Sequence, residues 1–200
     1  MSEPAYPLES PDLEGQDWPA QGQWTYEDYL RIPEDGRRYE VIRGTLYVSA
    51  SPIYNHQFTL VQLLLKLGSY VQQNELGIVL PAPFDIILPE GIATPVEPDI
   101  LFIRKENQPR WGDKNFQGVP DLLVEVLSPS THYYDRRIKL AAYRDAGVPE
   151  YWLVDPLSRT VAIHGWKDGS FTELKRGGEG DEVTSIVLPG FHLQVKSLFG

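Results

Sequence analysis

Glu125 is the residue whose position in the sequence most clearly calls for chemistry. It stands in the middle of a short apolar run, Leu122 to Leu127, which follows Pro120 and ends at Ser128. A run of this kind indicates a buried strand. An ionised carboxylate that leaves water is strongly destabilised unless a cation, a proton or a metal compensates it. Glu125 therefore favours a functional cleft, and an ion pair with an arginine is the alternative.

A second carboxylate, Asp99, follows Pro98 at the start of another strand-like segment. If the strands that carry Asp99 and Glu125 are neighbours, the two carboxylates face each other across about 5 Å. Two hard oxygen donors, completed by a backbone carbonyl and waters, suit Mg²⁺ or Mn²⁺, whereas structural zinc prefers nitrogen and sulfur ligands. The alternative is that Asp99 caps backbone N–H groups in the turn after Pro98.

The helix predicted after the Glu125 strand carries Asp135, Lys139 and Tyr143 on one face, at positions i, i+4 and i+8. Because this helix returns against the strand, Lys139 could reach the carboxylates. There it could orient or help to deprotonate a water and offset charge on a phosphate, with Asp135 holding it in place. A surface ion pair between Asp135 and Lys139 would account for the same spacing.

Four further residues are candidates for supporting roles. Arg136 and Arg137 belong to the most basic segment of the chain, so they are candidate nucleic-acid contacts or members of a solvated helix face. Glu40 lies in a strand-like segment and His56 near the start of a long helix. Either could add to a metal site or contact phosphate. Glu40 could equally pair with an arginine, and His56 could be a helix-start or core histidine.

The elements that must position these residues alternate between strand and helix patterns. We expect strands in two antiparallel segments within 38–48, and at 78–80, 84–88, 99–103, 121–127, 151–154, 159–166, 170–174 and 183–188. We expect helices at 25–30, 54–73 and 133–146, and a loop at 105–119. A helix between the strands 121–127 and 151–154 predicts that these two are parallel neighbours. The apolar breadth of the helix 54–73 predicts cover on more than one side.

Composition limits the classes of protein that this chain can represent. Its 200 residues suit one domain, and the absence of cysteine fits a reducing cytoplasm, which is the expected location. No stretch approaches the roughly 18 apolar residues of a membrane span, and the start of the chain lacks a signal pattern, so we expect no membrane partner. The net charge of −10 argues against a protein that coats nucleic acid nonspecifically. Residues 1–22 are rich in acids and proline and predict a disordered tail, which leaves 23–200 as the folded domain.

Three groups of residues resemble one bacterial family. They are Tyr39-Glu40-Val41-Ile42-Arg43-Gly44 with His56 and the segment 97–103, then the segment 120–131, and finally Asp135 to Lys139 with 147–156. The chain resembles, over about residues 24–199, the Uma-two family of restriction-endonuclease-like proteins within the PD-(D/E)XK nuclease superfamily. The resemblance implies an α/β fold with a restriction-endonuclease-like core, in which helices flank a mixed β-sheet, with extra N- and C-terminal β-strands.

The resemblance also implies a metal-dependent endonuclease that hydrolyses the phosphodiester bonds of nucleic acid, expected to be DNA. Asp99, Glu125 and the Val126 carbonyl would bind Mg²⁺ or Mn²⁺. The lysine expected two residues after Glu125 is Leu127 here, and Lys139 is the position that matches it. The alternatives are an inactive binding or interaction module on the same fold, or a phosphatase of small esters. A homodimer is expected if the protein cuts two strands.

Overall fold

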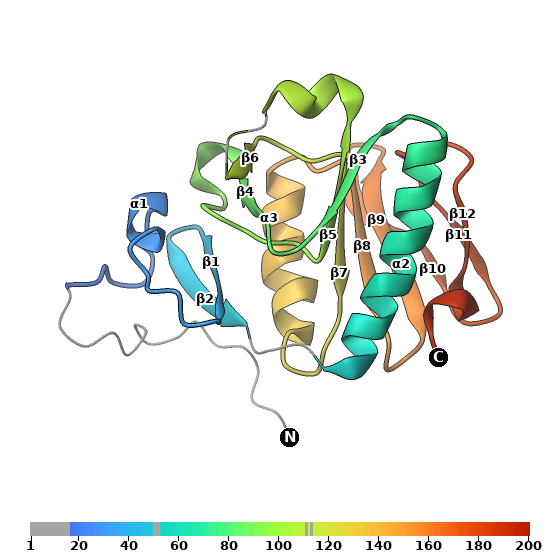
Figure 1. Cartoon of the computed structure of the whole chain (residues 1–200), viewed down its shortest axis with the longest axis horizontal. Helices are drawn as coiled ribbons and strands as arrows, with labels where there is room; N and C mark the ends of the chain where they lie inside the picture. The colour runs from blue at the N-terminus through green and yellow to red at the C-terminus, as the bar shows by residue number, and fades with distance from the viewer. Residues whose placement is uncertain (1–16, 50–52, 111, 113) are drawn as a thin grey trace.

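A six-stranded sheet forms the centre of the computed structural model, which describes residues 17–49, 53–110, 112 and 114–200 (Figure 1). The strand order is β10 (Ser170–Gly177), β9 (Thr160–Lys167), β8 (Glu150–Asp155), β7 (Leu122–Val126), β5 (Ile100–Arg104) and β3 (Gly77–Pro81). β7 and β8 are parallel, and the other neighbouring pairs are antiparallel. The predictions of a mixed central sheet and of a parallel pair joined by a helix are therefore confirmed.

Helices cover both faces of this sheet. α2 (Tyr54–Gln73) packs on one face, where Leu63 and Leu67 join a core with Leu122 and Val124 of β7. The other face meets η3 (Tyr134–Lys139), a π-helical segment, and its continuation α3 (Leu140–Asp145). Because side chains alternate along a strand, Glu125 projects toward the face that η3 and α3 cover.

The prediction that α2 is covered on more than one side is confirmed, because the helix packs against β3 and β7 of the sheet and also against η4 (Val195–Leu198). Its inward face is buried along its length at Leu63, Leu67 and Val71, which recur at a spacing of four residues. Val61 and Leu65, however, are 48% and 59% exposed. The sheet meets only one side of the helix, so these two side chains face solvent.

A small β-hairpin carries Glu40 to the central sheet. It consists of β1 (Arg38–Ile42) and β2 (Thr45–Ser49), joined by a two-residue turn in which Arg43 and Gly44 have φ of 51° and 70°. Short α1 (Tyr26–Tyr29) precedes it, capped by Thr25 as predicted. β1 is anchored by backbone hydrogen bonds of 2.8 Å from the Val41 N–H to Pro95 and from the Thr94 N–H to Val41. This docking places Glu40 beside the residues that lead into β5.

Further short elements lie at the margins of the sheet. The segment predicted as a loop at 105–119 contains η2 (Lys105–Arg110) and β6 (Asn115–Gln117), which pairs in parallel with β4 (Asp85–Ile87). η1 (Pro89–Gly91) follows β4, and η4 (Val195–Leu198) lies near the C-terminus. The expected N- and C-terminal β additions are β1–β2 and the pair β11 (Glu182–Thr184) and β12 (His192–Gln194).

The last predicted strand is too long, because β11 ends at Thr184 rather than continuing to residue 188. The Glu150 carboxylate explains where it ends. Its Oε2 accepts hydrogen bonds of 2.8 Å from the Ser185 hydroxyl and from the N–H groups of Ile186 and Val187. These N–H groups are therefore not available to a β-ladder.

The predicted tail lies mostly outside the described residues, which begin at Asp17. In its remaining part, Trp18 stacks on Trp24 with ring centroids 5.3 Å apart. Gln21 exchanges hydrogen bonds with the backbone of Leu46. The contacts of the domain thus start before residue 23. In the portion of the chain that the structure describes, none of the helices has the length and apolar character needed to cross a membrane.

Candidate active site

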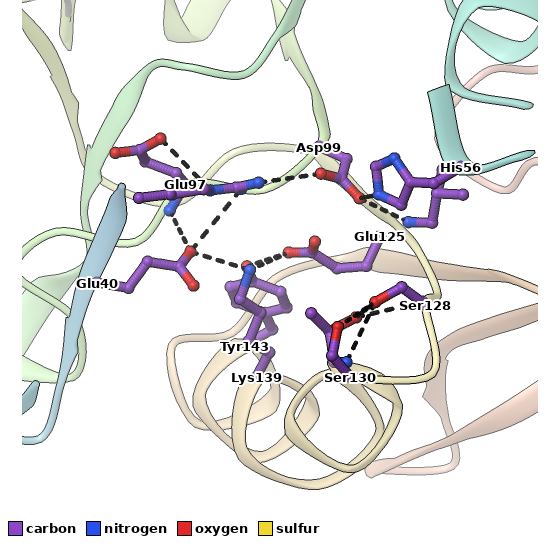
Figure 2. Close-up of polar contacts among 12 residues, drawn as sticks. Glu40, His56, Glu97, Asp99, Glu125, Ser128, Ser130, Lys139 and Tyr143 are labelled. Carbon is purple, nitrogen blue, oxygen red and sulfur yellow. Dashed lines mark hydrogen bonds and ion pairs between the residues drawn. The ribbon is translucent and has the colours of Figure 1, made fainter. Parts of the chain in front are cut away.

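A cleft of about 440 Å³ opens where β1, α2, β7 and η3 meet. Arg38, His56, Asp99, Glu125 and Lys139 are among the residues that line it. Figure 2 shows that the side chains of Glu40, Glu97, Asp99 and Glu125, which come from separate segments of the chain, lie close together. The cleft therefore gathers most of the residues that the sequence singles out.

Asp99 immediately precedes β5, and Glu125 lies in the neighbouring strand β7. In the antiparallel pairing of β5 with β7, Ile100 is opposite Val124, so the next position in register sets Asp99 against Glu125. The Val126 N–H donates a 2.8 Å hydrogen bond to Asp99 Oδ2, which holds the aspartate to the end of β7. Since the N–H and C=O of one residue in a strand point to the same edge, the Val126 carbonyl is directed toward the Asp99 side.

Asp99 is surrounded by cations and donors. His56 Nε2 lies 3.1 Å from its Oδ2, and Arg38 Nη1 lies 3.1 Å from its Oδ1. Burial by itself would raise the pKa of Asp99, but the His56 hydrogen bond and the Arg38 charge together hold this pKa below its usual value. Asp99 is thus an ionised carboxylate although only 4% of its surface is exposed.

Lys139 lies between two buried carboxylates. Its Nζ is 2.8 Å from Glu125 Oε1 and 2.9 Å from Glu40 Oε1. The Tyr143 hydroxyl also donates to Glu125 Oε1, at 2.9 Å. Burial would lower the pKa of Lys139, but the two carboxylates raise it above its usual value. Burial raises the pKa of Glu125, against the opposing charge of Lys139. Lys139 therefore reaches Glu125, which is one of the two alternatives that its position in the sequence leaves open.

Glu97 completes the acidic side of the cleft. Its backbone N–H donates a 2.6 Å hydrogen bond to Glu40 Oε1, and its Oε2 lies 3.4 Å from Arg38 Nε. Burial raises the pKa of Glu97 to about 7, although the nearby charge of Arg38 lowers it. Four carboxylates, from Glu40, Glu97, Asp99 and Glu125, thus surround the two cations Arg38 and Lys139.

Asp135 lacks the partner that its spacing suggested, and Arg136 and Arg137 lie outside the lining of the cleft. Among the described residues, no ion pair joins Asp135 to Lys139, because Glu125 and Glu40 lie closer to the ammonium group. Asp135 still lines the cleft, and burial raises its pKa to about 7. Arg136 pairs with Asp155 at 3.6 Å. Arg137 is exposed, and neither arginine belongs to the lining of the cleft.

Sequence reasoning assigned no role to Arg38 or Glu97, which lie at the centre of the site. A signal for both was present, because each stands two residues before a candidate acid. Arg38 precedes Glu40 and Glu97 precedes Asp99 with the alternation that puts both members of a pair on one face of an extended segment. That spacing could have added both residues to the site.

The donor chemistry of the cleft fits a hard divalent ion in part. Asp99, Glu125 and the Val126 carbonyl supply oxygen donors, and in the described part of the chain no hydrogen-bond donor contacts Glu125 Oε2. No group of three or more His, Cys, Asp or Glu side chains in that part is arranged to hold a metal ion, so waters would have to complete the coordination. Arg38 Nη1 already forms an ion pair with Asp99 Oδ1, one of the oxygens that a metal ion would use.

Comparisons with known proteins place the fold. No curated protein matches the chain. The chain is similar to a solved structure from Anabaena variabilis ATCC 29413, titled a "putative nuclease belonging to DUF820", with 20% sequence identity and a TM-score of 0.69. That match covers 88% of this chain and 97% of the other, and at this identity it shows a shared fold. The model of the Uma2 family, described as "Putative restriction endonuclease", matches residues 26–196. The chain therefore belongs to the Uma2 family.

Proposed function

We propose that this protein is an endonuclease that hydrolyses phosphodiester bonds of nucleic acid, expected to be DNA, with Mg²⁺ or Mn²⁺ as cofactor. The observation that carries the proposal is the juxtaposition of Asp99 and Glu125 across β5 and β7, with Lys139 bonded to Glu125, in one cleft. Membership of a family described as restriction endonucleases agrees with this chemistry.

Each residue of the cleft has a distinct task in this proposal. Asp99, Glu125 and the Val126 carbonyl would hold the metal, which when bound supplies an activated water and stabilises charge on the phosphate. Lys139 orients the attacking water through its hydrogen-bonding ammonium group and keeps Glu125 in place. His56 and the Val126 N–H fix the orientation of Asp99.

The test is a cleavage assay with purified protein. Supercoiled plasmid is incubated with Mg²⁺ or Mn²⁺ and the wild-type protein, the Glu125→Gln variant or the Glu75→Gln variant. Glu75 is the matched control, because its carboxylate is 81% exposed and forms an ion pair with Lys105 at the surface. Wild type and Glu75→Gln should cut the plasmid, and Glu125→Gln should not. Equal cutting by all three proteins would refute the proposal.

A second candidate function is a binding or interaction module that does not cleave its partner. It is favoured by one observation, which is that both oxygens of Asp99 are already engaged by protein groups. Calorimetric titration with Mn²⁺ separates the two functions. A nuclease should take up the ion in a manner that Asp99→Ala abolishes, whereas the inactive module should show no such uptake.

A further inference from the structure

Arg38 is the most weakly bonded cation of the cleft. Its Nη1 donates to Asp99 Oδ1 at 3.1 Å, whereas its Nε lies 3.4 Å from Glu97 and its Nη2 lies 4.0 Å from Glu40. Nε and Nη2 are buried, and neither has a hydrogen-bond partner among the described residues. The guanidinium is thus held mainly by the charge of three surrounding carboxylates and by one hydrogen bond.

The two carboxylate oxygens of Asp99 have different hydrogen-bond partners. Oδ2 accepts from His56 and from the Val126 N–H, which belong to α2 and to β7. Oδ1 is contacted by Arg38 alone among the residues that the structure describes. A divalent ion that binds Asp99 through Oδ1 therefore meets the guanidinium of Arg38.

We propose that Arg38 is a resident cation that neutralises Asp99 while no metal is bound and competes with the metal for this carboxylate. This inference rests on the proposed metal-dependent function. Lys139 is less suited to the role, because it is 2% exposed and bonded to Oε1 of both Glu125 and Glu40. The Arg38 side chain as a whole is 26% exposed and lines the cleft, so the space into which it would move on leaving Asp99 adjoins it.

Arg38 is a positioning residue in this proposal, because it acts by competing with the metal ion for the Asp99 carboxylate. Its release would leave a planar guanidinium in a cleft that Ser128 and Thr131 also line. A guanidinium in that place can donate two parallel hydrogen bonds to a phosphate. Metal binding would thus release the Arg38 guanidinium from Asp99 and make it available to bind a phosphate of the substrate.

The test is calorimetric titration with Mn²⁺ of the full-length wild type and three variants. Because two cations that share one carboxylate repel each other strongly, Arg38→Gln should lower the Kd for Mn²⁺ about tenfold. Arg38→Lys keeps the charge, so its Kd should stay within about threefold of wild type. Arg37→Gln is the matched control, because Arg37 immediately precedes Arg38 but bonds to Asp35 instead. Its Kd should remain within about twofold of wild type.

Each other outcome has a defined meaning. If wild type and Arg38→Gln bind Mn²⁺ with the same Kd, the competition is refuted and the nuclease proposal survives. If Arg38→Lys lowers the Kd as much as Arg38→Gln, the effect does not come from charge and the inference is refuted. If no protein takes up Mn²⁺, both the inference and the metal-dependent function fail.

A measurement on the wild type covers the case in which Arg38→Gln does not fold. In protein labelled with ¹⁵N, the Nε–H resonance of Arg38 is assigned by its loss in Arg38→Lys and followed during titration with Mg²⁺. The inference predicts that this resonance shifts together with the backbone amide of Val126, which reports on Asp99. A response of the Val126 amide without any response of Arg38 would refute it.

Discussion

Replacing Lys139 by methionine tests whether its ammonium group compensates two buried carboxylates. The side chain is 2% exposed, with Nζ 2.8 Å from Glu125 and 2.9 Å from Glu40. Methionine has a similar length and fills the same space without the charge. The variant therefore isolates the loss of the cation from the loss of packing.

The expected cost follows from what remains around each carboxylate. Removing one partner of a buried ion pair costs about 3–5 kcal/mol of unfolding free energy. Glu125 keeps the Tyr143 hydroxyl at 2.9 Å, and Glu40 keeps the Glu97 N–H at 2.6 Å. Because each acid retains a neutral donor, we expect the lower end of this range, about 3 kcal/mol at pH 8.

The cost should depend on pH in a defined direction. Burial already raises the pKa of Glu125 in the folded protein, and loss of Lys139 removes the charge that opposes this rise. A carboxyl with a raised folded pKa favours folding below its unfolded pKa and loses that contribution as the pH rises. The deficit of Lys139→Met should therefore be smaller at pH 5 than at pH 8.

Urea denaturation at both pH values measures the effect. Lys105→Met is the matched control, because this lysine is 58% exposed and pairs with Glu75 at the surface, so its change should stay within about 0.5 kcal/mol. The double variant Lys139→Met with Glu125→Gln should recover at least about 1 kcal/mol relative to the sum of the single changes. Strict additivity, or a deficit equal at both pH values, would refute the reasoning.

Three further predictions concern other parts of the molecule. Burial raises the pKa of Asp135 to about 7, above its unfolded value, so its contribution to stability is present at low pH and is lost as the pH rises through 7. Relative to wild type, Asp135→Asn should gain about 2 kcal/mol between pH 5 and pH 8 in urea denaturation, and a constant difference would contradict this. Glu150→Gln should cost about 2 kcal/mol in the same assay, because the amide cannot accept every hydrogen bond that Trp152 and residues 185–187 donate; an unchanged midpoint would contradict it. If Arg137 contacts phosphate, Arg137→Ala should weaken DNA binding equally for all sequences and reduce the salt slope by about 1 in fluorescence anisotropy, whereas an unchanged slope would remove it from the interface.

The hydrophobic pattern predicted the central elements because their burial repeats with a local period. The β7 run was recognised from Leu122, Leu123, Val124 and Val126, all of which are buried. The same kind of pattern says less about α2, where Val61 and Leu65 are apolar but exposed. Periodicity describes which side chains share a face, and it does not tell how many faces have a neighbouring element.

The candidate site, too, could be predicted from the sequence only in part. The approach of Asp99 to Glu125 could be predicted from the two strand-like segments that carry them, and the buried charge of Glu125 indicated that a cation lies nearby. The alternation in the sequence puts Arg38 on the same face as Glu40, but it does not identify Asp99 and Glu97, about sixty residues away in the chain, as the partners of Arg38. The docking of β1 on the segment before β5 brings them together, and it depends on backbone hydrogen bonds between distant segments.

The sequence by itself determined the strand that carries Glu125, the helix that carries Lys139 and the family to which the chain belongs. These depend on local periodicity and on runs of contiguous residues. Only the tertiary structure decided that Lys139 pairs with Glu125 and Glu40 rather than with Asp135, and that Arg38 pairs with Asp99. Such choices among ionic partners follow from distances of a few ångström in a buried cleft, where the nearest opposite charge prevails and position along the chain has no influence.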